Sequence, residues 1–224
     1  GMSNYLTNLP FFADGQGLNP LLQNYWMTIH PPTLFLGFAS TSIPFAYAIA
    51  GLWEKDYRGW ITPALPWAYF GVGILGAGIL MGGAWAYEAL SFGGFWAWDP
   101  VENSSLVPWL ILVAGAHLMI INKNKKKPTA LFSTIYLTLL SFLLVLYSTF
   151  LTKSGVLGDT SVHSFVDSGI LPQLLTYLLA FVLLAHTLLL GTAKRRIYHL
   201  ASTGIVLLLV FAGEHGIAML GFIL

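Results

Sequence analysis

Long apolar runs constrain what this chain can fold into more than any other feature of its sequence. Each is close to the length of about 20 apolar residues that one membrane crossing needs. None alternates apolar and polar residues as a membrane β-strand does, and backbone in hydrocarbon must satisfy its own hydrogen bonds. The runs predict an all-α, polytopic transmembrane bundle of about six helices. They are Thr33–Leu52, Trp67–Leu90, Ser105–Ile121, Thr129–Leu151, Ile170–Gly191 and Ile197–Ala212, with an apolar tail at Ile217–Leu224.

Charged residues make up only 8% of the chain. Soluble domains carry roughly 25%, so this chain has too little charge to cover a surface that faces water. Composition therefore excludes a soluble globular protein and a disordered one. We expect a single membrane domain over residues 1–224, surrounded by lipid and without a nucleic-acid partner.

The positive charges predict the orientation of the bundle. Nine of the ten Lys and Arg residues fall on one side, which the positive-inside rule assigns to the cytoplasm. The outer side then receives residues 1–32, 85–109 and 152–169, and Lys153 is its single basic residue. Residues 1–32 lack a signal peptide, so we expect a preceding span and a chain that is a fragment or a split subunit of a longer protein.

Residues 85–109 form a tryptophan-rich outer segment that holds half of the eight Trp residues. One interpretation is structural: aromatic residues form belts at membrane interfaces, and Asp99, Pro100 and Glu102 have the spacing of a capping box. This interpretation leaves the density of aromatic rings around Gly93–Gly94 unexplained. A flat, apolar ligand lying at the membrane surface explains the density better, because aromatic faces pack well against such a ligand.

Two histidines share the outer side with this segment. His30 precedes Pro31 and Pro32, and we expect it just outside the start of the first span, since a residue before proline favours extended backbone. His163 lies in the outer loop 152–169. Taken alone, each histidine fits an interfacial ring and Lys153 fits a snorkelling side chain. Together they predict haem, with the two imidazoles on the iron, the Trp cluster around the macrocycle and Lys153 near a propionate.

Three motifs, in order, resemble the CcmF family of cytochrome c haem lyases. They are Gly17–Pro20 with His30–Pro32, Phe95–Asn103 with Pro108–Leu110, and Leu151–Val156 with Ser161–Phe165. The central motif also resembles the WWD domain that the CcmC and CcsA families share, whereas the flanking motifs favour CcmF. The resemblance spans roughly residues 17–165, about two-thirds of the chain.

The resemblance implies a haem lyase component in which His30 and His163 are the catalytic ligands of the incoming haem iron. A periplasmic haem chaperone would deliver that haem, and apocytochrome c would supply two thiols for thioether bonds to its vinyl groups. The absence of Cys from this chain fits the scheme. The expected location is the bacterial inner membrane with the motifs facing the periplasm, or the mitochondrial inner membrane. Expected haem-binding residues are Trp85, Trp96, Trp98, Asp99, Glu102, Asn103, Trp109 and Lys153.

The family also holds a second, b-type haem inside the membrane. The resemblance implies His117 as one ligand, and His199 ranks narrowly above His186 as the other. We expect Glu88 to orient an axial histidine, and the glycines of the second span to form a packing surface. Because family members are much longer, the remaining lyase or other maturation subunits are expected partners.

Two other functions compete with the lyase. A CcmC-like module would bind haem and pass or export it to a chaperone without catalysing attachment. A generic transporter would use the Trp cluster only as an interface belt. Bound haem would distinguish the lyase and the CcmC-like module from the transporter. Covalent attachment of haem would distinguish the lyase from the CcmC-like module.

Overall fold

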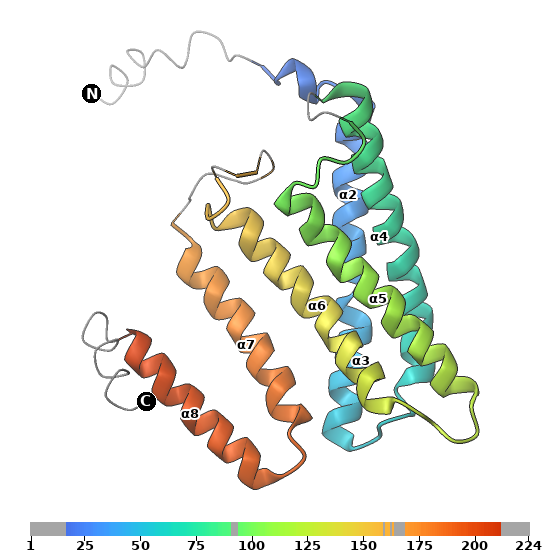
Figure 1. Cartoon of the computed structure of the whole chain (residues 1–224), viewed down its shortest axis with the longest axis vertical. Helices are drawn as coiled ribbons and strands as arrows, with labels where there is room; N and C mark the ends of the chain where they lie inside the picture. Colours follow the sequence, from blue (N-terminus) through green and yellow to red (C-terminus); the bar gives the residue numbers. More distant parts are fainter. Residues whose placement is uncertain (1–16, 91–93, 159, 162, 164–168, 212–224) are drawn as a thin grey trace, which may run out of the picture.

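The computed structural model describes residues 17–90, 94–158, 160, 161, 163 and 169–211, and every regular element within them is a helix (Figure 1). Glu214, His215 and the predicted apolar tail lie outside the described residues. The all-α prediction is confirmed. The elements are η1 (Pro20–Leu22), α2 (Tyr25–Ser40), α3 (Ser42–Glu54), α4 (Ile61–Ala89), α5 (Pro100–Asn124), α6 (Leu131–Lys153), α7 (Leu171–Leu189) and α8 (Ala193–Phe211).

Five helical segments in the described part are long and apolar enough to cross a membrane: α2 joined to α3, and each of α4, α5, α6 and α7. The predicted first run proves to be two helices that meet at the buried residue Thr41. The predicted sixth run falls in α8, whose first turn carries Lys194, Arg195 and Arg196. The chain is therefore an integral membrane protein with a polytopic helical bundle.

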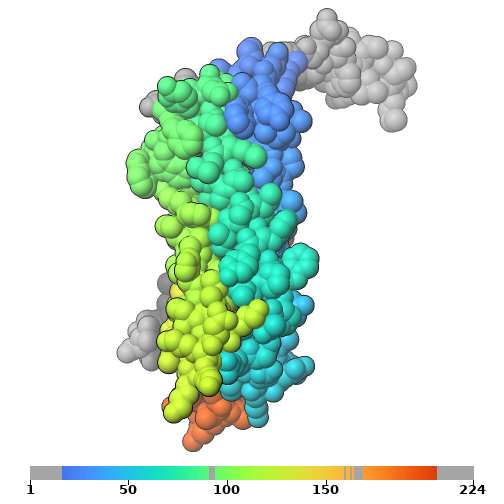
Figure 2. Space-filling view, turned by 90° about the vertical axis from the view of Figure 1, so that its right-hand side faces the viewer, coloured from blue at the N-terminus to red at the C-terminus, as the bar shows by residue number. Residues whose placement is uncertain are grey.

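Helices α2 and α4 pack closely because small residues face the neighbouring backbone. A Cβ added at Gly37 would lie 2.6 Å from Leu75 Cα, and one added at Gly78 would lie 2.8 Å from Leu34 Cα. Gly71, Gly76 and Gly78 of the second span thus pack against neighbouring helices, as predicted. Gly73 does not, since a Cβ there would meet nothing within 4 Å, and Gly82 lies against the His30 ring. Along the face seen in Figure 2, α4 and α5 run side by side.

The placement of His30 outside a helix start is wrong. Helix α2 begins at Tyr25, since the Asn24 side chain caps it by accepting a hydrogen bond from the Trp26 N–H at 3.0 Å. Pro31 and Pro32 then follow inside the helix, beyond its first turn, where each lacks the N–H that would bond to the carbonyl four residues earlier. His30 thus lies on a regular turn of α2, and its ring faces α4.

The inner ends of α5 and α6 are joined by a buried amide. Asn122 is fully buried, and its Nδ2 donates to the Thr134 hydroxyl at 2.8 Å and to the Leu118 carbonyl at 3.0 Å. Its Oδ1 accepts from the Thr129 N–H at 3.0 Å. Because all these groups are paired, a polar side chain is tolerated in an otherwise apolar contact.

Candidate functional site

A cavity of about 290 Å³ lies at the outer end of the bundle, where α2, α4, α5 and α6 meet the loops on either side. It has an apolar floor from side chains such as Leu34, Phe38 and Ile79. The chain brings together here residues from three motifs that are far apart in sequence. The predicted site residues that line it are His30, Trp85, Trp96, Glu102, Lys153 and His163.

Helix α4 holds the His30 ring in place. The His30 Nδ1 lies 2.8 Å from the Gly78 carbonyl oxygen, and a carbonyl can only accept, so Nδ1 carries the proton and Nε2 keeps its lone pair. The ring also meets Trp85 edge-on, with centroids 5.9 Å apart. A Cβ at Gly82 would lie 2.7 Å from His30 Cε1, so the ring occupies the space that this glycine leaves.

Asp99 contacts the second histidine. The His163 Nδ1 lies 3.2 Å from Asp99 Oδ1, and the Ser161 hydroxyl donates to the same oxygen at 2.8 Å. Ser161 Oγ in turn accepts the His163 backbone N–H at 3.1 Å. The Asp99 carboxylate therefore faces the Nδ1 edge of the His163 ring.

The carboxylate of Asp99 remains charged in this setting. Burial by itself opposes the charged form. Hydrogen bonds from Ser161 and from the Val101 N–H, together with nearby His163, outweigh that effect and hold the pKa of Asp99 below its ordinary value. The site therefore contains a fixed negative charge beside one histidine.

The capping box predicted at the start of α5 is confirmed. Asp99 accepts from the Val101 N–H at 2.8 Å, and Glu102 Oε2 accepts from the backbone N–H groups of Ala97 and Asp99 at 3.0 and 3.1 Å. Asn103 Nδ2 donates to the Trp98 carbonyl at 3.1 Å. These polar side chains hold the backbone of residues 96–99 in place.

Each of the two Trp side chains in the cavity wall has a hydrogen-bond donor without an acceptor among the described residues. The indole Nε1 atoms of Trp85 and Trp96 are shielded from water, and no acceptor for them occurs among the described residues. A buried N–H without an acceptor costs about 1–3 kcal/mol. A ligand that is mostly apolar but carries acceptor oxygens would fit such a wall.

Two other predicted tryptophans lie elsewhere. Trp98 does not line the cavity: it is 71% exposed, has φ of 59°, and meets the ring of Trp96 edge-on at 6.3 Å. Trp109 donates its Nε1–H to the Val72 carbonyl at 2.9 Å and lies against Gly76, between α5 and α4. Trp109 is thus part of the helix packing.

The histidines predicted for a second haem have different surroundings. His117 is exposed on α5, with its Nδ1 2.8 Å from the Val113 carbonyl of the same helix. His199 of α8 stacks on His186 of α7, with ring centroids 4.3 Å apart. The contacts described for His117 and His199 are therefore with different partners.

Two contacts of the site were not predicted from the sequence. Ser161 contacts Asp99 and Gly82 contacts His30, and no local pattern predicts contacts between residues so far apart along the chain. The expected role of Glu88 is wrong, because its carboxylate accepts the indole N–H of Trp26 at 2.6 Å and it is Asp99 that contacts a histidine.

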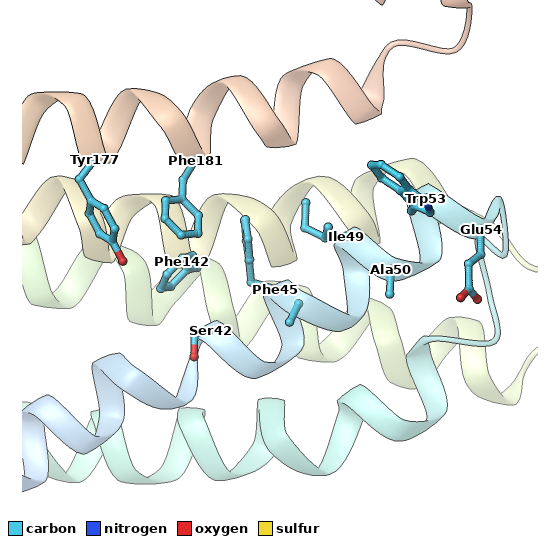
Figure 3. A pocket seen from close by; sticks show the side chains of 10 residues that line it. Ser42, Phe45, Ile49, Ala50, Trp53, Glu54, Phe142, Tyr177 and Phe181 are labelled. Carbon is cyan, nitrogen blue, oxygen red and sulfur yellow. The ribbon is translucent and has the colours of Figure 1, made fainter.

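A larger cavity, of about 620 Å³, lies between α3, α6 and α7 (Figure 3). Its wall is mainly aromatic and aliphatic, with Phe45, Phe142 and Phe181 close together. None of the predicted site residues lines it, and we assign the functional site to the outer cavity.

Comparison with known proteins shows the family to which this chain belongs. Residues 2–157 match the family described as "Cytochrome C assembly protein". The chain belongs to this family. The CcmF protein of Pseudomonas aeruginosa is 41% identical over 172 residues, which are 76% of this chain and 25% of that protein. The CcmF protein of Escherichia coli strain K12 is 39% identical over 186 residues, which are 81% of this chain and 27% of that protein.

A solved structure of the cytochrome c haem lyase CcmF has the same fold in the shared region. It superimposes with a TM-score of 0.61 at 35% identity, covering 75% of this chain and 26% of that one. The resemblance to CcmF-type haem lyases is thus confirmed. The chain spans about a quarter of the length of these relatives.

Proposed function

We propose that this chain binds haem in the outer cavity and presents it for thioether attachment to apocytochrome c. One observation carries the proposal: His30 and His163 come from distant motifs and line the same cavity, each with Nδ1 next to an acceptor. With Nδ1 facing a protein oxygen in both rings, Nε2 is the atom through which each histidine would bind iron. In this role the two histidines contact the substrate and count as catalytic.

The cavity wall suits the remainder of a haem. Apolar side chains and the faces of Trp85 and Trp96 would contact the macrocycle. Their indole N–H groups, and the ammonium of Lys153 in the same wall, would meet the propionates. A haem is larger than about 290 Å³, so an edge would stay outside the cavity, where apocytochrome c could reach the vinyl groups.

Attachment adds a thiol across each vinyl double bond. Each addition forms one C–S bond and one C–H bond, without net oxidation. This chain contains no Cys, so both thiols come from the apocytochrome. The part played by this chain is to hold the iron and fix the edge that reacts.

Membership of the family supports a proposal for the partners and the location. A haem chaperone would supply the haem, and other maturation subunits or the rest of a lyase would complete the machinery. The site would face the periplasm from the bacterial inner membrane, or the corresponding side of the mitochondrial inner membrane. A b-type haem on His117 stays a prediction, as does its pairing with His199, and no step here depends on it.

Haem titration of the purified protein tests the proposal. The wild type should develop a Soret band, and His30→Ala or His163→Ala should weaken haem binding by at least about tenfold, or about 1.4 kcal/mol, by loss of an axial ligand. Asn124→Ala is the control, since Asn124 is exposed at the far end of α5 and does not line the outer cavity. A wild type without a Soret band, or variants that bind as the wild type does, would exclude this function.

Covalent attachment distinguishes the lyase from a CcmC-like module. In cells that contain the partner proteins, His30→Ala or His163→Ala should stop formation of holocytochrome c. If attachment proceeded in both variants while haem was bound, the cavity would serve haem transfer and another protein would catalyse attachment.

A further inference from the structure

We propose that Asp99 is a positioning residue for the outer haem site, and that its carboxylate holds the His163 imidazole with Nε2 towards the iron. The inference rests on the proposed function, since it concerns how one of the two axial ligands is held. It gives Asp99 a role through His163 in place of the direct haem contact predicted from its motif.

A single oxygen atom makes the relevant contacts. Asp99 Oδ1 lies 3.2 Å from His163 Nδ1, 2.8 Å from the Ser161 hydroxyl oxygen and 2.8 Å from the Val101 nitrogen. The Asp99 side chain is only 9% exposed, so water screens the contact with His163 poorly. The charge therefore acts mainly on the imidazole beside it.

The carboxylate is held firmly by the start of α5. Asp99 is the N-cap, Pro100 follows it in the first turn, and Glu102 accepts the Asp99 N–H at 3.1 Å. Ser161 bridges Asp99 and the outer loop, because it donates to the carboxylate and accepts the His163 N–H at 3.1 Å. The capping box of one helix thus fixes a histidine that lies on a different segment.

The two histidines would therefore differ in how strongly each imidazole donates electrons to the iron. His30 Nδ1 faces the neutral Gly78 carbonyl, whereas His163 Nδ1 faces a carboxylate. A carboxylate partner raises the basicity of the other ring nitrogen and so strengthens its bond to a metal. Because the ferric ion has the larger charge, the stronger donor stabilises ferric over ferrous haem.

Asp99→Asn is the decisive variant. Asn is as good an N-cap as Asp and keeps an acceptor oxygen, so α5 should still form while the charge beside His163 is lost. We expect haem to bind with a ferric-over-ferrous preference about tenfold smaller, measured as a midpoint potential about 59 mV higher for this one-electron couple. Ser161→Ala, which removes the bridge and keeps the charge, should shift the potential less and in the same direction.

Asp56→Asn is the matched control. Asp56 is also a loop carboxylate that accepts backbone N–H groups, from Arg58 at 3.2 Å and Gly59 at 2.8 Å, but it belongs to the opposite end of the bundle. The midpoint potential of haem bound to Asp56→Asn should equal that of haem bound to the wild type.

The outcomes separate this inference from the function beneath it. A wild type that binds no haem overturns both. A second outcome is that the wild type binds haem, His163→Ala does not, and the midpoint potential in Asp99→Asn and Ser161→Ala equals that of the wild type. This outcome overturns the role of Asp99 but supports the haem site. If Asp99→Asn failed to fold, as judged by circular dichroism, an unshifted potential in Ser161→Ala would overturn the inference by itself.

Discussion

Gly82 shows how a residue without functional groups can determine the geometry of a site. It lies on α4 directly against the His30 ring, with 2.7 Å between the position of an added Cβ and His30 Cε1, and 3.3 Å to each ring nitrogen. Real Cβ atoms do not approach other atoms that closely. Since Gly78 also holds Nδ1 of this ring, the imidazole has little freedom to move aside.

Gly82→Ala should therefore weaken haem binding by at least about tenfold, or about 1.4 kcal/mol, by displacing an axial ligand. Haem titration followed at the Soret band measures the effect. Gly73→Ala is the control on the same helix, because a Cβ there meets nothing within 4 Å. If the two variants bound haem with equal affinity, the proposed role of Gly82 in positioning the His30 ring would be contradicted.

At the scale of elements, the α5–α6 hairpin joins the outer site to the inner face. Its outer end holds the capping box and Lys153, and its inner end is joined through the buried Asn122. The hydroxyl of Ser104 on α5 also lies 2.8 Å from that of Ser148 on α6. Polar contacts at several depths therefore set how the two helices align.

Removal of the inner contact should destabilise the hairpin without touching the haem site. We expect Asn122→Ala to lower the free energy of unfolding by about 1–3 kcal/mol, because the Thr129 N–H and the Thr134 hydroxyl lose a buried partner. Thermal unfolding in detergent, followed by circular dichroism, measures this. Asn124→Ala is the control, since Asn124 is exposed at the end of the same helix. A melting temperature unchanged in Asn122→Ala would argue against the network.

At the scale of the whole molecule, a basic loop and the candidate site lie at opposite ends of the bundle. The cavity opens at the end of α2 where Tyr25 lies, whereas the basic loop Lys125–Lys127 follows the far end of α5. The positive-inside rule then predicts that the site faces away from the cytoplasm.

Cysteine labelling tests this orientation without background, since the chain has no Cys of its own. Tyr25→Cys should react with a membrane-impermeant maleimide added to the periplasmic side of intact cells. Lys126→Cys should react only after the membrane is opened. The opposite pattern would place the cavity in the cytoplasm and exclude delivery of haem from a periplasmic chaperone.

Local patterns were enough to predict the helical bundle, the capping box at Asp99–Glu102 and several of the residues that line the outer cavity. Those features depend on apolar runs and on neighbours within one turn, so they are visible along the chain. Tertiary packing alone decided the rest. Asp99 and Ser161 lie 62 residues apart and His30 and Gly78 lie 48 apart, and only packed helices bring them within 2.8 Å. The start of α2 at Tyr25, which places His30 inside a helix, is by contrast marked locally by the N-cap Asn24, and the two prolines after His30 obscured that signal. Several residues of the cavity wall were therefore predictable from residue types and motifs, whereas the way each histidine is held was not, because it depends on contacts between distant segments.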